Sequence, residues 1–201
     1  GYALAAGRQA LASHSWEEAS DIFARGLESP ALDPVSKEAG ELWFGLGRAQ
    51  GMMWGNERSG TIAGSLTRAF DIFVSLGDRP KAVEVAGIYI PQGQGRPATG
   101  RLLERGLELA IPGSPGAIGL MVRLGLAYGL EENRLQDARN IFAEATRVAR
   151  SLGNPGLEAR ALGAEARVEM NHALFDSALE KALMAAEVGL RSEDADAAIY
   201  A

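Results

Sequence analysis

The feature that most constrains the fold of this 201-residue chain is a long internal repetition. The tetrapeptide Arg-Gly-Leu-Glu occurs at 25–28 and again at 105–108, and Ser-Leu-Gly-Asp at 75–78 is matched by Ser-Leu-Gly-Asn at 151–154. The copies lie roughly 80 residues apart, about twice the ~34 to 40 residues of a common two-helix repeat. We therefore expect an array of helical hairpins, in which two hairpins make one larger repeating unit.

Composition limits the classes of function open to the chain. The formal net charge of −6 opposes a phosphate backbone, whose binding depends on Lys and Arg, so we expect no nucleic-acid partner for this segment. Cysteine is absent, which excludes disulfides and thiolate chemistry and fits a reducing cytoplasm. No run of ~18 apolar residues and no signal-peptide pattern occurs. We expect a cytoplasmic protein with no membrane partner.

Capping residues predict where the helices begin. Ser15 and Glu18 fit a capping box, in which each side chain satisfies a free backbone donor near the other. A capping side chain also stands directly before a proline, which is tolerated at the first helical position, at Asp33, Ser114 and Asn154.

Two glycines predict where helices end. Gly77 and Gly153 suit the left-handed residue that closes many helices, and each is followed by a cap for the next helix. Together with the starts, they predict ten helices, with an eleventh beginning near Asp194. The expected ranges are 2–13, 16–28, 35–53, 61–76, 79–90, 97–110, 115–130, 135–151, 155–171 and 174–190.

Small residues recur where paired helices would touch. The second helix of each expected pair carries apolar or small residues spaced four and then three apart, for example Ala19, Phe23 and Gly26, or Ala138, Phe142 and Ala145. A small residue ends each triplet. First helices carry a matching small residue at Gly7, Gly47 and Gly125 and, one register off, at Ala166. We predict an all-α, right-handed superhelical solenoid forming a single domain over 1–201, a segment of a longer protein, with five antiparallel hairpins at about 2–29, 35–77, 78–111, 114–153 and 154–191.

The first helices also carry a family pattern. A large residue followed three positions later by Leu-Gly is the spacing of tetratricopeptide repeats, and it occurs at Trp43 with Leu46-Gly47 and at Met121 with Leu124-Gly125. The chain resembles tetratricopeptide arrays over nearly its full length. Segments 68–78 and 145–154 resemble the degenerate repeats of large bacterial regulators that carry a nucleotide-switch ATPase, a LuxR-type DNA-binding domain or an adenylate cyclase domain. The resemblance implies a sensor or interaction arm of a transcriptional or signalling regulator, which also contacts the flanking domains of its own chain.

Candidate binding residues follow from this resemblance. In tetratricopeptide arrays the residue after the small first-helix site tends to face the concave groove, and here those positions are Arg8, Arg48, Leu126 and Arg167. Arg160 lies two turns before Arg167, on nearly the same helix face. Guanidinium groups pair bidentately with carboxylates and phosphates, so the row predicts a groove for an anionic protein segment or small effector.

Two apolar residues extend the predicted groove, and two acids offer an alternative. Phe44 and Met52 belong to an expected helix whose large apolar residues cannot all face one core, so we assign both to the groove. Packing in the core is the alternative for most of these residues, and contact with a neighbouring segment is another. Alternatively, the arginines pair with Glu41, Glu165 and similar neighbours and only keep the surface soluble.

Enzyme chemistry finds little support. The glycine-rich stretch 91–100 lacks both the Lys-Ser/Thr pair of a P-loop and the GxGxxG spacing, so we read it as an irregular loop. His14 and His172 fall in turns too far apart to share a metal, and Glu131-Glu132 is expected to be an exposed turn pair. We predict no catalytic residue, cofactor or metal. The alternatives are a homo-oligomerisation module and a helical enzyme that binds a phosphate-containing ligand through 91–100.

Overall fold

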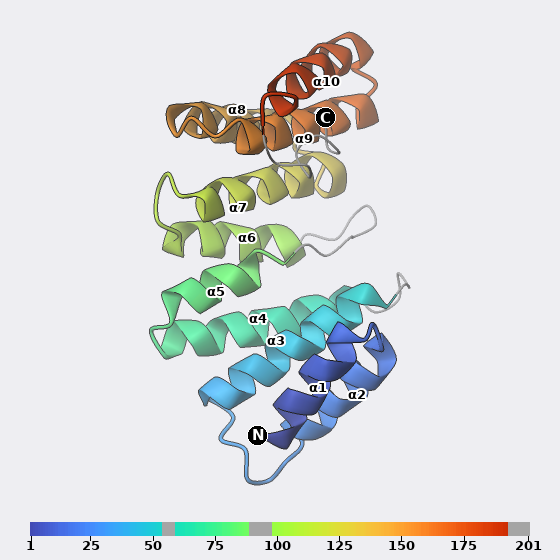
Figure 1. The fold of residues 1–201 in the computed structure, drawn as a ribbon, viewed down its shortest axis with the longest axis vertical. Coiled ribbons are helices and arrows are strands. Elements are labelled where there is room, and N and C mark those ends of the chain that lie inside the picture. The colour runs from blue at the N-terminus through green and yellow to red at the C-terminus, as the bar shows by residue number, and fades with distance from the viewer. Residues whose placement is uncertain (54–58, 89–97, 193–201) are drawn as a thin grey trace. The chain divides into compact units, whose positions relative to one another are not determined.

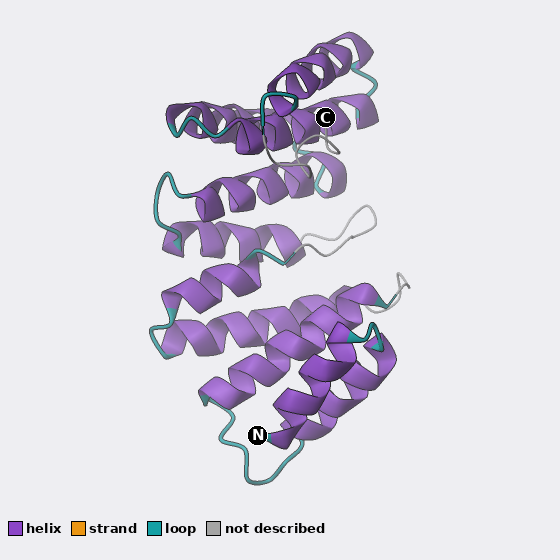
Figure 2. Cartoon of the chain, viewed as in Figure 1, coloured by secondary structure: helices purple, strands orange, loops and turns teal. Residues whose placement is uncertain are grey.

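The computed structural model describes residues 1–53, 59–88 and 98–192, and within these ranges all regular structure is helical (Figure 2). Ten α-helices follow one another there, and one π-helical turn, η2 (Ala127–Glu131), continues α7 (Figure 1). The α-helices are α1 (Tyr2–Ala12), α2 (Trp16–Leu27), α3 (Lys37–Met52), α4 (Ser59–Ser75), α5 (Arg79–Ala86), α6 (Ala98–Leu109), α7 (Pro115–Leu126), α8 (Leu135–Ser151), α9 (Pro155–Asn171) and α10 (Phe175–Gly189). Among the described helices, none is long and apolar enough to cross a membrane.

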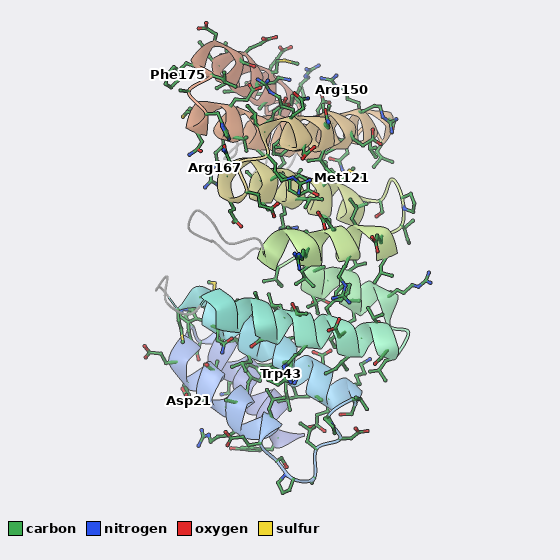
Figure 3. The ribbon with its side chains drawn as sticks, turned by 180° about the vertical axis from the view of Figure 1, so that it is seen from behind. Asp21, Trp43, Met121, Arg150, Arg167 and Phe175 are labelled. Carbon is green, nitrogen blue, oxygen red and sulfur yellow. The ribbon has the colours of Figure 1, made fainter. Side chains whose placement is uncertain are left out.

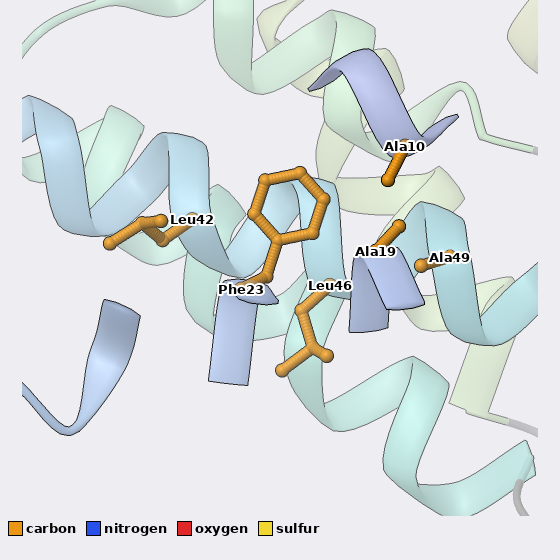
Figure 4. Close-up of a cluster of buried hydrophobic side chains, with 6 residues drawn as sticks. All are labelled: Ala10, Ala19, Phe23, Leu42, Leu46 and Ala49. Atoms are coloured by element: carbon orange, nitrogen blue, oxygen red, sulfur yellow. The ribbon is translucent and has the colours of Figure 1, made fainter. Parts of the chain in front are cut away.

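The chain divides into two compact units, Gly1–Gly93 (unit 1) and Gln94–Ala201 (unit 2). In unit 1 each of α1 to α4 packs on the next helix, and α1 also packs on α3. Phe23 is buried at the centre of this packing, and its ring lies where a Cβ atom would stand at Gly7 of α1 and at Gly45 of α3. The cluster around it is completed by Ala10, Ala19, Leu42, Leu46 and Ala49 (Figure 4).

Unit 2 repeats the same packing order. Each of α6 to α10 packs on the next through unit 2, and α7 also packs on α9. Phe142 of α8 is fully buried against Gly125 of α7, where an added Cβ would lie 2.6 Å from the ring. Phe142 and Phe23 are each the middle member of a predicted triplet, and each meets a predicted first-helix glycine. The sequential packing is consistent with helix hairpins.

Most predicted helix ends are confirmed. The Ser114 and Asn154 side chains accept hydrogen bonds from the Ala117 and Leu157 N–H groups at 3.2 and 3.0 Å. The backbone has φ of +71° at Gly77 and +63° at Gly153.

The predicted start of α2 at Trp16 is confirmed, but two predicted caps were wrong. Ser15 precedes α2 but makes no side-chain cap hydrogen bond. Asp33-Pro34 does not open α3, because Asp33 Oδ1 accepts the Val35 N–H at 3.1 Å and closes a turn instead. The cap is Ser36, whose hydroxyl accepts the Ala39 N–H at 3.2 Å.

The third expected hairpin, 78–111, is only partly visible. Its two helices form as α5 and α6, but they belong to different units. The link between them, 89–97, lies outside the described residues, as does the helix expected near Asp194. The expected helix 115–130 ends as an α-helix at Leu126 and continues as the wider turn η2.

Candidate functional site

Three of the predicted groove residues, Arg8, Phe44 and Arg48, lie close together in unit 1. Glu41, Phe44 and Arg48 lie on one face of α3, because positions three, four and seven apart overlie one another on a helix. Arg8 of α1 and Lys81 of α5 reach the same face. We call Arg8, Glu41, Phe44, Arg48 and Lys81 the cationic cluster.

Glu41 joins two of the cations. Arg8 Nη2 donates to Glu41 Oε2 at 3.0 Å, and Lys81 Nζ lies 3.5 Å from Glu41 Oε1. Lys81 Nζ is also 2.9 Å from Glu84 Oε2, one turn along α5. The Arg8 pair matches the alternative predicted from the sequence, in which groove arginines pair with neighbouring acids.

The ring of Phe44 packs beneath two of the cations, Arg48 and Lys81. The Lys81 Nζ atom lies 4.8 Å from the centroid of its ring, and Arg48 Cζ lies 5.8 Å from it, both within reach of a cation–π interaction. Only 4% of Phe44 is exposed, so it supports the two cations and cannot meet a ligand without rearrangement. Arg48 is exposed and makes no ion pair with any residue in the described ranges. Its guanidinium therefore remains available to an anion.

The other predicted groove residues lie elsewhere. Met52, 51% exposed, stands at the end of α3. Arg160 and Arg167 belong to α9 of unit 2, where Arg160 is half-buried and engaged and Arg167 is exposed (Figure 3). Glu165 of the same helix pairs with Lys181 of α10 at 3.1 Å rather than with an arginine. The single row of four arginines remains a prediction.

A pocket on unit 1 was missed from the sequence. It has a volume of about 400 Å³, and the Arg68 guanidinium carbon lies 5.0 Å from the centroid of the Trp43 ring at its wall. Arg68 and Asp71 of α4 supply its polar groups. No local pattern marks these residues or Lys81, because their roles depend on how α4 packs on α3 and how α5 packs on α4. The remaining lining residues are Leu27, Leu32, Pro34, Ala39 and Ile72.

The expectation of an exposed Glu131-Glu132 pair was wrong. Both acids are partly buried, and η2, which contains Glu131, packs against α6, α8 and α9. Burial, followed by the charge of Glu132, raises the pKa of Glu131 to about 7. Arg134 holds Glu132 at 3.1 Å and Asp137 at 2.8 Å.

Tyr128 lies beside these acids in unit 2 and contacts both Glu104 and Arg134. Its hydroxyl donates to Glu104 Oε1 at 2.6 Å, and the Arg134 guanidinium stacks 3.8 Å from the ring centroid. Burial and the bond to Glu104 raise the pKa of Tyr128 to about 12. The phenol therefore stays protonated at neutral pH and acts here as a structural donor.

Both histidines occupy turns, as the sequence predicted. His14 packs edge-on against Trp16 with ring centroids 5.1 Å apart, and His172 Nε2 lies 2.8 Å from the carbonyl oxygen of Gly129. Across 1–53, 59–88 and 98–192, no three His, Asp or Glu residues are grouped to hold a metal ion. Most of the glycine-rich stretch 91–100 lies outside the described residues, and its last three residues open α6.

Comparison with models of known protein families and with curated protein sequences finds no match for this chain. The resemblance to tetratricopeptide arrays therefore remains a prediction from the sequence.

Proposed function

We propose that this protein is a non-enzymatic binding scaffold that holds an anionic protein segment or small effector at the cationic cluster. The observation that carries the proposal is the meeting of Arg8, Arg48 and Lys81, from three different helices, around one carboxylate and one ring. Within the described residues, the acids paired with these three cations are Glu41 and Glu84, so one positive charge is left in excess on this face.

A ligand carboxylate or phosphate can bind here without displacing Glu41. Arg48 offers a planar fork of donors for bidentate contact, and Lys81 carries three donors, of which Glu41 and Glu84 occupy two. Phe44 fixes the direction of both cations from beneath, which lowers the entropy lost on binding. Affinity should fall with added salt, because exposed charges are screened.

The finer architecture is part of this proposal. In a right-handed superhelical solenoid, the first helix of each hairpin lines the concave surface, and α1, α3 and α5 are the first helices of the first three expected hairpins. The cluster would then lie in the groove. The resemblance to degenerate bacterial repeats supports a place as the interaction arm of a transcriptional or signalling regulator.

The test is binding of a fluorescein-labelled octaglutamate peptide, followed by anisotropy at low and moderate salt. We expect Arg48→Ala and Lys81→Ala each to weaken binding about fivefold or more, since each removes a charge-assisted contact of about 1 kcal/mol or more. Arg25→Ala, on an exposed arginine of α2 in the same unit, is the matched control. Equal affinity of the Arg48→Ala and Arg25→Ala proteins, at an unchanged thermal midpoint, would end the proposal.

A further inference from the structure

The outer face of α10 exposes large apolar side chains. The exposed fractions are 67% for Phe175, 61% for Leu179, 63% for Leu183 and 83% for Leu190. Phe175 stands at the outer edge of the helix (Figure 3). Single exposed apolar residues are common on proteins, but three on α10 and a fourth, Leu190, at its C-cap form a patch that indicates an interaction site.

The spacing of these residues fits contact with one further helix. Leu179, Leu183, Ala186 and Leu190 are separated by four, three and four residues, the repeat of a coiled-coil seam. The opposite face of α10 is already occupied, because its Ala185 and Val188 join the core formed with α9. α10 is therefore apolar on two faces, of which only one is covered by a described helix.

Acidic side chains border one edge of this apolar stripe. At 100° per residue, Asp176, Glu180 and Glu187 fall side by side next to Leu183. Lys181 does not offset them, because it turns inward to Glu165 at 3.1 Å and only 28% of its side chain is exposed. Arg191 pairs with Glu187 at 3.5 Å, so two of the three acids keep an unbalanced charge.

This charge decides between possible occupants. A second copy of α10 would bring its own acids to the same stripe, where like charges repel. The sequence of 193–201 contains three acidic residues and no lysine or arginine, so it is not complementary either. A helix with lysine or arginine beside its apolar residues satisfies both the seam and the acidic edge.

We propose that α10 docks an amphipathic helix of a partner protein whose apolar stripe is bordered by basic residues. This surface lies in unit 2 and selects positive charge, whereas the cationic cluster lies in unit 1 and selects negative charge. The two sites are independent, so each can fail alone.

The probe is a labelled peptide of about 21 residues, three heptads long, with leucine at the seam positions and lysine beside them. A matched peptide has glutamate in place of lysine. Anisotropy should show the lysine peptide binding the full chain at least tenfold more tightly than the glutamate peptide. Leu179→Ser and Leu183→Ser should each weaken it about tenfold, as loss of an interface anchor does. Ile111→Ser, an equally exposed apolar position of unit 2, is the control and should leave it unchanged.

Charge reversal gives the second arm. Glu180→Lys should weaken the lysine peptide and strengthen the glutamate peptide, while circular dichroism shows an unchanged fold. Equal binding of the two peptides, or no effect of both leucine variants, overturns the proposal. So does a concentration-dependent dimer in light scattering that Leu183→Ser abolishes, which would assign the face to a second copy. A thermal midpoint lowered by Leu179→Ala and Leu183→Ala, which keep the helix propensity, would assign it to the chain's own residues.

Discussion

Replacing Gly45 by alanine should destabilise unit 1, because the ring of Phe23 occupies the space that a Cβ atom would need. An ideal Cβ at Gly45 would lie 2.6 and 2.7 Å from two atoms of this ring. Phe23 is 1% exposed and its other side meets Gly7, so the ring cannot move away. The overlap must be relieved by shifting α3 against α2.

The magnitude is a balance of two effects. Overpacking a well-packed core costs about 1 to 3 kcal/mol, whereas alanine is favoured over glycine inside a helix by about 1 kcal/mol. We expect Gly45→Ala to lower the free energy of unfolding by up to about 2 kcal/mol, the overpacking cost less the gain in helix propensity. Gly64 of α4 is exposed and has no atom within 4 Å of an added Cβ. Gly64→Ala therefore gains helix propensity without overlap and should raise stability by about 0.5 to 1 kcal/mol.

Urea denaturation followed by tryptophan fluorescence measures this difference in the right part of the chain, because all three tryptophans lie in the sequence of unit 1. Combining Gly45→Ala with Phe23→Leu should recover about 1 kcal/mol of the expected additive loss, since the smaller side chain frees the space. If Gly45→Ala proves as stable as Gly64→Ala, or the pair behaves additively, the close contact of α2 and α3 is not what stabilises unit 1.

Three further outcomes follow from unit 2. The pKa of Glu131 is about 7 in the folded state and 4.5 in the unfolded chain, so between these pH values only the folded state keeps the proton. The stability that this proton contributes is full below about pH 4.5 and is lost as the pH rises through 7. Relative to Glu131→Gln, the unfolding free energy should fall by about 1 to 2 kcal/mol between pH 4.5 and 8, after allowance for solvent screening, as urea titrations at both pH values would show. Arg139→Met should cost about 2 to 4 kcal/mol by leaving the buried Glu169 carboxylate without its partner at 2.7 Å, and adding Glu169→Met should restore most of it in the same assay. Ala173→Gly should raise the thermal midpoint by about 1 to 3 °C, because alanine at φ +58° is strained by more than glycine loses in the unfolded chain.

The sequence predicts the helices well where caps are strong. α8 and α9 have the bounds expected from the sequence, because Gly153 ends one helix and Asn154-Pro155 starts the other. The start of α3 was misplaced because two competing caps, Asp33 and Ser36, stand close together. Which one opens the helix depends on the turn that Asp33 makes with Val35, and residue type alone does not decide this.

The candidate site was predictable only in part. Register placed Arg8 and Arg48 on equivalent positions of two helices, and the structure brings them to one cluster. Lys81 could not be found this way, because it reaches Glu41 of α3 only through the packing of α5 on α4. The burial of Glu131 was missed for a similar reason, since the sequence gives no signal for a wider turn in place of α-helix.

Five turns between helices share one backbone conformation, although the residues that adopt it differ. A left-handed residue closes each of five helices: the glycines Gly77 and Gly153 between expected hairpins, and the non-glycines His14, Asn133 and Ala173 within them. The N–H that follows the left-handed residue donates to a carbonyl one turn and a half earlier in the helix, as in a Schellman motif. These bonds join Ser15 to Ala10, Asp78 to Phe73, Asn154 to Ala149 and Leu174 to Glu169 at 2.9 to 3.1 Å.

The fifth turn supports a common geometry by its one difference. Here the backbone N–H of Arg134 donates to the carbonyl oxygen of Tyr128 at 2.8 Å. The acceptor lies one residue farther back than in the other turns, because η2 adds a residue to the last turn of its helix. The left-handed turn therefore forms even where the preceding helix has one extra residue in its last turn. It forms whether the left-handed residue is His, Asn, Ala or Gly. An L-residue pays about 1 to 2 kcal/mol for this conformation, which persists only if the packing of the paired helices requires it. The same left-handed turn thus occurs even where the residue does not favour it. This shared backbone geometry supports the proposed repeat of hairpins more strongly than the two repeated tetrapeptides do.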